Sequence, residues 1–354
     1  MSKLSAPSAW WLRIGTPTEG FRYLGASGRP LTSASVIRRI EALVIPPAWM
    51  GVHISPDPTR KVQAWGYDGA GRRQYIYSHG HVEARDQRKW HRVLHVARAL
   101  PGLRATTNEH LQRSSIDREK ILATVVRLIC RAYFRAGSER YAVRNRTFGI
   151  CTLDKRHVTI DGRNLVFTYT GKQRKDHRQV VADTPLVEII EELMRLPGRR
   201  LFQYPAGNGG GSFRAVTAQA VNRYLSDLLS ERYTSKDLRT FGGTVRAATI
   251  LADLGPPRSS AEAKRNTKLA VSLTALELGN TPAICRKAYI HPAVLSEYEN
   301  AGRTVASPVS PGAPHRTSMP EVETVEPVGY YPEELALMRF LEMIHGTHHE
   351  SFSV

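Results

Sequence analysis

The chain has 354 residues, enough for two domains of ordinary size, and a net charge of +18 from lysine and arginine spread along its length. This charge favours a partner with a phosphate backbone, although a ribosomal or merely basic protein has the same composition. Three widely spaced cysteines exclude a disulfide framework and a CxxC zinc site, and without an apolar run or a signal peptide we expect a soluble, cytoplasmic protein.

A small β-rich module is predicted at the start of the chain. Strand patterns at 52–54, 61–65 and 74–77 are separated by Pro-Asp-Pro and Asp-Gly turns, and residues 35–43 have a helical pattern. These short elements predict an α+β module of about domain size.

Two tyrosines in the third of these strands are candidate ligands of nucleic acid. Alternation puts Tyr75 and Tyr77 on one face, close to Arg72 and Arg73. Phenols beside arginines can contact bases and phosphates. Core tyrosines are the more common explanation for such a pair.

Two helices are predicted next. Residues 81–100 have a helical pattern that stops at Pro101. A second helix begins near Ser114 and runs towards Arg135, where Gly137 is the predicted stop.

A β-meander follows, with strands predicted at 148–153, 157–160, 165–169 and 177–181. An Asp-Gly pair supplies the turn between the second and third strands. Lys172 lies in the hairpin loop before the last strand, so we expect it to be exposed.

The rest of the body is predicted to be mostly helical. Helices are expected from Thr184-Pro185 to Pro197, over 217–230, and from a cap at Ser235 through Leu251. A helix that restarts at Thr281-Pro282 carries Tyr289 about two turns in.

The last 50 residues differ from the body. Residues 305–354 contain seven Glu and two Arg, so their charge is −5 and residues 1–304 carry +23. The Pro- and Ser-rich stretch 307–320 predicts disorder. After Pro332 a short amphipathic helix is expected, which could lie on the basic body or bind a partner; its apolar face consists of Leu337, Phe340, Leu341 and Ile344.

Two segments, 236–244 and 278–289, place an arginine, a short amide and a phenol in an order that suits attack on a phosphodiester. This chemistry needs cations on the phosphate oxygens, a proton for the departing 5′ oxygen and an in-line nucleophile. Arg239, inside an otherwise apolar helix, is awkward as a core residue unless it meets a carboxylate or a phosphate. No carboxylate cluster is built to hold a metal ion.

Several ordered blocks resemble one enzyme family over most of residues 20 to 300. The chain looks like a type IB DNA topoisomerase of the compact poxvirus and bacterial branch. The matching blocks are residues 45–49, 63–68, 71–77, 144–153, 170–172, 236–243 and 288–289.

The resemblance implies the fold class and the domains. We expect an α+β protein of the topoisomerase IB and tyrosine recombinase type, with a small β-rich domain and a larger, mainly helical catalytic domain that contains a β-meander. The domains would be a DNA-clamping domain at 1–85, the catalytic domain at 86–304 and an acidic tail at 305–354.

The resemblance also implies a role for each catalytic residue. Tyr289 would attack the phosphate and hold the 3′ end as a phosphotyrosine. Arg135 and Arg239 would bind the non-bridging oxygens, and Lys172 would protonate the 5′ oxygen. Asn280 stands where the family usually has histidine; an amide can donate a hydrogen bond but cannot become charged.

The expected partner is double-stranded DNA, clamped by a monomer and relaxed without ATP, metal or cofactor. We expect this in a bacterial cytoplasm, in association with the nucleoid. The predicted DNA contacts are Gln63, Arg72, Arg73, Tyr75, Tyr77 and Lys236.

Plainer explanations exist for the same residues. Arg135 could be a surface cation, Asn280 a helix cap, and Lys172 competes with Arg174 and Lys175 for the role of acid.

Two other functions stay open. A tyrosine recombinase shares the catalytic architecture, although this chain has a lysine where the recombinase motif has histidine. A basic DNA-binding protein without activity has the same charge.

Overall fold

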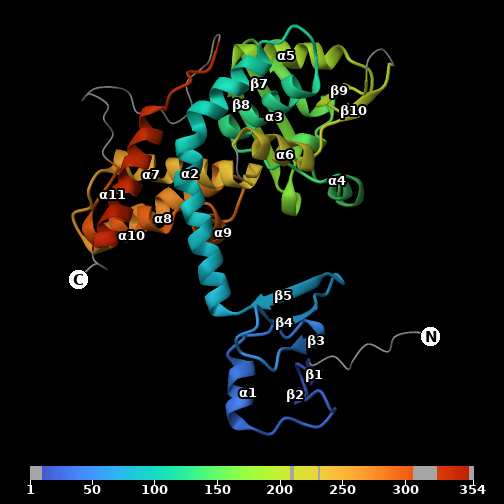
Figure 1. The fold of residues 1–354 in the computed structure, drawn as a ribbon, viewed down its shortest axis with the longest axis vertical. Coiled ribbons are helices and arrows are strands. Elements are labelled where there is room, and N and C mark those ends of the chain that lie inside the picture. The colour runs from blue at the N-terminus through green and yellow to red at the C-terminus, as the bar shows by residue number, and fades with distance from the viewer. Residues whose placement is uncertain (1–9, 208–210, 230–231, 306–324, 351–354) are drawn as a thin grey trace. The chain divides into compact units, whose positions relative to one another are not determined.

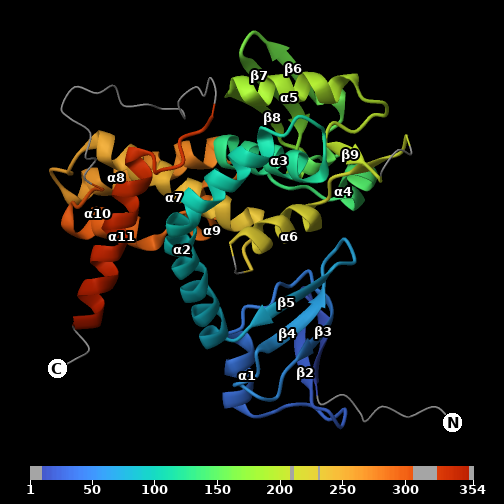
Figure 2. The same cartoon turned by 45° about the horizontal axis from the view of Figure 1, so that its top comes forward.

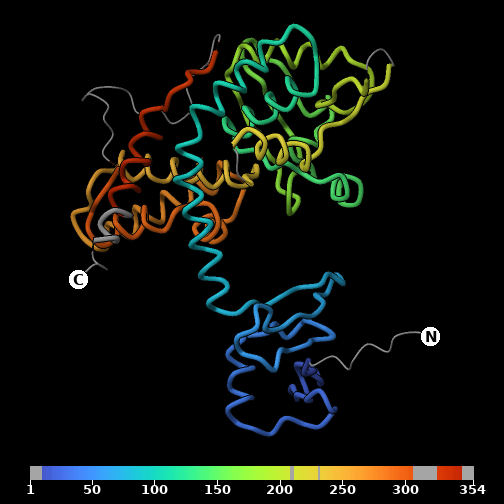
Figure 3. The backbone as a smooth tube through the Cα atoms, in the orientation of Figure 1, coloured from blue at the N-terminus to red at the C-terminus, as the bar shows by residue number. Residues whose placement is uncertain are grey.

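The computed structural model divides into two compact units, residues 1–89 and 90–354. Figure 3 follows the backbone from the first unit, in blue, through to the second. None of the described helices is long and apolar enough to cross a membrane. The structure describes residues 10–207, 211–229, 232–305 and 325–350.

The first unit is an antiparallel sheet with one helix. The strand order is β2-β1-β3-β4-β5. The helix packs on one face, where Ile40 meets Val52, Ile54 and Ala64 in a small apolar core (Figure 1). The strand and helix patterns predicted here are confirmed. The elements are β1 (Trp11–Thr16), β2 (Gly20–Leu24), α1 (Ala34–Glu41), β3 (Met50–Ile54), β4 (Val62–Tyr67) and β5 (Arg73–Tyr77).

The second unit is mainly helical and holds most of the core. It begins within α2, which carries the chain out of the first unit. This mixture of a β-rich first unit and a mainly helical second unit confirms the predicted α+β class. The elements are α2 (His79–Leu111), α3 (Arg118–Ala132), α4 (Glu139–Asn145), β6 (Val158–Asp161), β7 (Asn164–Thr170), β8 (Asp176–Ala182), α5 (Thr184–Arg195), β9 (Gln203–Pro205), β10 (Phe213–Ala215), α6 (Ala218–Leu228), α7 (Ser235–Leu254), α8 (Ser260–Glu277), α9 (Pro282–Ala288), α10 (Pro292–Ala301) and α11 (Pro332–Glu350).

Helix α3 is the centre of this unit. It contacts α6, α7, β8 and β9, so apolar residues surround it instead of forming one stripe. Ile121, Leu122, Val125 and Leu128 are fully buried. The residues that follow α3 are therefore fixed by a rigid element.

The three-stranded sheet β6-β7-β8 is the predicted meander, and Figure 2 shows it next to α5. Leu165, Phe167 and Tyr169 alternate along β7 and are buried in the core. Gly162, with φ of +57°, makes the predicted turn between β6 and β7. Lys172 follows β7, so the prediction that it lies in a hairpin loop is confirmed.

Two predicted helix ends are wrong. Helix α2 continues through Pro101 to its last residue, Leu111. Proline removes one backbone hydrogen bond, but the next turns bury Leu103 and Leu111, and this burial outweighs the loss. Helix α3 ends before Tyr133, which has φ of +54° and caps it, so Gly137 is not the stop.

The strand predicted at 148–153 is also wrong, because a single 3₁₀ turn occupies its centre. The amides of Ile150 and Cys151 donate to the carbonyls of Arg135 and Ala136, at 2.8 and 2.9 Å. These apolar residues are buried against the loop after α3, so they need no strand partner. The turn anchors the backbone of Arg135.

The acidic tail forms the predicted amphipathic helix, α11, and its apolar face is buried at Leu337 and Leu341. Glu334 pairs with Arg104 of α2 through two hydrogen bonds of 2.8 Å. Of the two possibilities, packing on the body is therefore the one observed (Figure 1). The stretch predicted to be disordered, 307–320, lies outside the described residues.

Candidate active site

Helix α7 delivers a buried guanidinium. Its N-cap is Thr234, one residue before the predicted cap, and the carboxylate of Asp237 accepts from the Thr234 backbone and hydroxyl at 2.9 and 2.7 Å. One turn later Arg239 is 3% exposed, and its Nη2 donates to Leu278 O at 3.1 Å. Its Nε has no hydrogen-bond partner among the described residues. Burial lowers the pKa of Arg239.

A second guanidinium comes from the loop after α3. Nη2 of Arg135 donates to Gly279 O at 3.1 Å and to Asn280 Oδ1. Its charge further lowers the pKa of Arg239. Within the described part of the chain, neither arginine has a carboxylate partner. Two neighbouring cations held by neutral oxygens form a site that suits an anion.

Asn280 completes this anion site. The side chain is 8% exposed, and its Oδ1 accepts from Arg135. Its Nδ2 is buried without a hydrogen-bond partner in the described structure. A buried donor without an acceptor is costly, so this place favours a water molecule or a ligand that accepts a hydrogen bond. An anionic oxygen next to Arg135 would meet that need.

Tyr289 stands directly after α9, a helix capped by Thr281, whose hydroxyl accepts from Ile284 N. The Tyr289 carbonyl accepts from Thr244 Oγ1 at 3.3 Å. Arg239 Cζ lies 5.2 Å from the centre of the Tyr289 ring. The phenol therefore lies beside the buried guanidinium, as the order of motifs predicts.

Lys172 is exposed at the tip between β7 and β8, where Gln173 and Arg174 have φ of +64° and +56°. Its side chain makes no hydrogen bond or ion pair with any described residue. The hairpin is nevertheless tied to the anion site, because Lys175 Nζ donates to Asn280 O at 3.1 Å. An unengaged amine on a tethered loop can reach a bound ligand.

Sequence reasoning missed His177, which lines a small pocket together with Arg135 and Arg239. Its imidazole stacks on Tyr169, with ring centres 5.0 Å apart. Burial, followed by the two guanidiniums, lowers the pKa of His177 to about 4. The signal was available: Lys175 directly precedes β8, and alternation carried back from the strand places it on the same face as His177.

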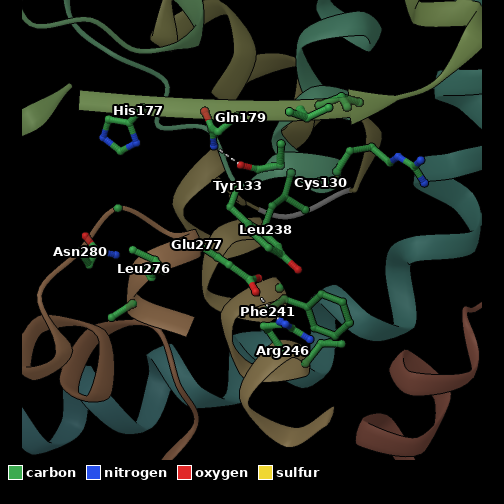
Figure 4. Close-up of a pocket in the computed structure, with 18 of the residues that line it drawn as sticks. Cys130, Tyr133, His177, Gln179, Leu238, Phe241, Arg246, Leu276, Glu277 and Asn280 are labelled. Carbon is green, nitrogen blue, oxygen red and sulfur yellow. Dashed lines mark hydrogen bonds and ion pairs between the residues drawn. The ribbon is translucent and has the colours of Figure 1, made fainter. Parts of the chain in front are cut away.

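A larger pocket of about 830 Å³ adjoins the site. Figure 4 shows His177 and Asn280 at one side of it and the ion pair between Arg246 and Glu277, 2.7 Å long, away from them. Among the residues that the structure describes, no group of three His, Cys, Asp or Glu side chains could hold a metal ion.

The first unit carries a ladder of aromatic rings and a cation on its exposed sheet face. Arg73 Cζ lies 3.7 Å from the centre of the Trp65 ring, and His53 stacks on Trp65 at 3.9 Å. Tyr75 and Tyr77 stack at 6.1 Å between ring centres. Tyr75 is 44% exposed and lies next to Arg73, Tyr77 is half-buried, and neither belongs to the apolar core of this unit.

The other predicted DNA contacts differ in their surroundings. Arg72 is exposed and pairs with Asp68 at 2.8 Å, and Lys236 is exposed in the first turn of α7. Gln63 is 3% exposed, and its amide donates to the carbonyls of Asp57 and Arg60. These bonds hold its amide inside the first unit, and a contact between Gln63 and DNA stays a prediction.

Comparison with known proteins agrees with this geometry. Residues 78–309 match the family described as eukaryotic DNA topoisomerase I, catalytic core, and residues 20–68 match the bacterial DNA topoisomerase IB N-terminal domain. DNA topoisomerase 1B of Acanthamoeba polyphaga mimivirus is 29% identical over 269 residues, 75% of this chain and 80% of the relative. DNA topoisomerase 1B of vaccinia virus strain Copenhagen is 25% identical over 244 residues, 65% of this chain and 70% of the relative. The catalytic-core match covers more than half of the chain, which therefore belongs to the type IB DNA topoisomerase family.

Proposed function

We propose that this enzyme relaxes supercoiled DNA through a 3′-phosphotyrosine intermediate at Tyr289, without ATP or a metal ion. The observation that carries the proposal is the pair of neighbouring guanidiniums, Arg135 and Arg239, which have no carboxylate partner in the described structure, with Arg239 beside the Tyr289 ring. Fixed positive charge of this kind stabilises the pentacoordinate phosphorus without a metal ion.

In the proposed reaction a bond forms between Tyr289 Oη and phosphorus while the bond from phosphorus to the 5′ oxygen breaks. The phenolic proton passes to water, and Lys172 donates a proton to the 5′ oxygen. Arg135, Arg239 and the Nδ2 group of Asn280 bind the non-bridging oxygens. The phosphotyrosine conserves the energy of the bond, so the 5′ hydroxyl can reverse the step after the strand has rotated.

We further propose that a monomer binds one duplex with both units. Four residues of the first unit, Arg72, Arg73, Tyr75 and Tyr77, would contact bases and backbone, and Lys236 would contact a phosphate next to Arg239. The second unit would have the catalytic fold shared with tyrosine recombinases. We also propose that it acts in a bacterial cytoplasm, in association with the nucleoid; the match of residues 20–68 to a bacterial domain family supports the bacterial setting alone.

Supercoiled plasmid incubated in EDTA without ATP tests the reaction. The wild type is expected to relax the plasmid and, after denaturation with detergent, to leave a covalent adduct on the 3′ side of the nick. Tyr289→Phe should do neither. Tyr141→Phe is the matched control, because Tyr141 is 51% exposed on α4 and takes no part in the site. Relaxation that needs Mg²⁺ or ATP, or an adduct that survives in Tyr289→Phe, contradicts the proposal.

A further inference from the structure

Two glycines in the site each precede a proposed catalytic residue. Gly171 comes directly before Lys172, and Gly279 comes directly before Asn280. The two pairs lie more than a hundred positions apart in sequence. A side chain added at either glycine would collide with the same group, the imidazole of His177.

The imidazole of His177 fills the space between these two turns. A Cβ added to Gly171 would lie 2.6 Å from Cδ2 and Nε2 of the ring, and one added to Gly279 would lie 2.0 Å from Cε1 and 2.9 Å from Nδ1. One edge of the ring therefore meets the hairpin and the opposite edge meets the Asn280 turn. No side chain larger than hydrogen fits at either glycine while the ring is present.

The ring itself is held from its own strand. Tyr169 is its cross-strand partner in the β7–β8 register, and the two rings are almost parallel, with 8° between their planes. Lys175 of the same hairpin bonds to the Asn280 carbonyl at 3.1 Å. The hairpin and the Asn280 turn are thus joined at two points, His177 and Lys175.

The charge state of the ring suits this place. Burial, Arg135 and Arg239 lower the pKa of His177 to about 4, so the ring is neutral at neutral pH. Lys175 acts in the same direction, and Asp176 acts against it. A neutral ring fills the space without adding a further positive charge beside the two guanidiniums.

We propose that His177 is a positioning residue that fixes the Lys172 hairpin against the Gly279–Asn280 turn. This proposal rests on the proposed function. One side chain, His177, then fixes the position of both Lys172, the proposed proton donor, and Asn280, which would bind the phosphate. Small displacements of reacting groups lower rates by about 10²-fold, so removal of the ring slows cleavage even though the ring does not touch the reacting atoms.

Single-turnover cleavage of two DNA substrates tests the link to Lys172. One substrate has the ordinary 5′ oxygen at the cleavage site, and the other has sulfur there, whose thiol has a pKa of about 8.5 and leaves without a proton donor. In His177→Ala we expect cleavage of the ordinary substrate to be about 10- to 100-fold slower than in the wild type. With the sulfur substrate, His177→Ala should cleave at a rate much closer to that of the wild type. Lys172→Ala, which lacks the proposed proton donor, shows how large this recovery of rate is when the donor is absent. A wild-type rate, or an equal loss on both substrates, overturns the proposal.

A double-mutant cycle of Gly171→Ala and His177→Ala tests whether the two residues act through their mutual contact or damage the site independently. Gly171 has φ of −98°, which alanine adopts without strain, and an added Cβ would collide with His177 while lying at an ordinary contact distance, 3.6 Å, from Tyr169, so Gly171→Ala disturbs the site through His177. Gly171→Ala should slow cleavage alone, yet add little in the His177→Ala background. Independent, multiplicative losses overturn the proposed contact.

Limited trypsin digestion gives a result that does not depend on activity. The hairpin offers cleavage sites at Lys172, Arg174 and Lys175, and release of the hairpin from the Asn280 turn should speed cutting there several-fold in His177→Ala. An unchanged rate refutes the positioning role. Absence of any adduct in the wild type would refute the proposed function, while the digestion still decides whether His177 holds the hairpin.

Discussion

Replacing Glu334 by glutamine tests how firmly α11 is built into the second unit. The Glu334 carboxylate accepts from Nη1 and Nη2 of Arg104, both at 2.8 Å, and from Tyr331 N at 2.9 Å. Arg104 and Glu334 are 5% and 6% exposed. Glu334→Gln keeps the shape of the side chain but leaves much of the buried positive charge of Arg104 uncompensated.

The expected magnitude follows from this geometry. Removing one partner of a buried ion pair lowers the free energy of unfolding by about 3–5 kcal/mol. We expect the lower end, about 3 kcal/mol, because Glu326 Oε1 remains 3.6 Å from Arg104 Nε. In a unit of this size each kcal/mol lowers Tm by about 2–4 °C, so Glu334→Gln should lower Tm by roughly 6–12 °C.

Thermal and urea unfolding followed by circular dichroism measure the change, with Glu342→Gln as the control. Glu342 lies on the same helix and pairs with Arg98 at 2.7 Å, but the two side chains are 39% and 54% exposed. A surface pair contributes about 0–1 kcal/mol, so the control should lose no more than a few degrees. The double variant Arg104→Met with Glu334→Leu should regain part of the stability, because neither member of this pair is then left buried alone, while Glu326 loses Arg104 and keeps Arg127 at 3.9 Å.

Equal losses in Glu334→Gln and Glu342→Gln would refute the reasoning, because burial would then have no influence on the value of the pair. A wild-type Tm for Glu334→Gln would show that α11 does not stay docked on α2 in solution.

Three further outcomes are expected. Asn280→Asp should slow cleavage by about 10²–10³-fold in single-turnover assays, because it removes a hydrogen-bond donor to the phosphate and adds a negative charge. Its Tm should stay the same or rise, because the new carboxylate can pair with the neighbouring guanidinium of Arg135. Gly242→Ala should lower the free energy of unfolding by about 1–3 kcal/mol in urea titrations, because an added Cβ would lie 2.2 Å from the Tyr133 ring. The control Gly102→Ala, which has open space around the added Cβ, should raise the free energy of unfolding slightly. Because the pKa of His177 falls from 6.5 in the unfolded chain to about 4 in the folded protein, the unfolded chain binds a proton between these pH values that the folded protein does not, and stability falls as the pH falls. His177→Asn lacks this proton, so its Tm should fall less than that of the wild type between pH 7 and 4.5.

Local signals in the sequence predicted several elements correctly. Helix α9 begins where Thr281 and Pro282 predict it, because a capping hydroxyl and a proline at the first position act within one turn. The same holds for α5, where Pro185 lies in the first turn. The Asp-Gly turn before β7 is equally local, since only its own residues decide the backbone angle at Gly162.

Other features depended on distant partners. Pro101 stops no helix, because the turns beyond it are buried against the rest of the second unit. Residues 148–153 alternate like a strand, yet they bond to the loop at Arg135 instead of to a neighbouring strand. The burial of Gln63, whose amide donates to the carbonyls of Asp57 and Arg60, is likewise set by the folding of the whole first unit.

The sequence by itself determined the family and the chemical types of the site residues, because the order of an arginine, an amide and a tyrosine can be seen along the chain. Only the tertiary structure decided that Arg239 and Arg135 are held by neutral oxygens, and that His177 fills the space between Gly171 and Gly279. These groups come from segments tens to more than a hundred positions apart. Their contacts follow from how whole helices and strands pack, and no pattern within a few residues encodes that packing.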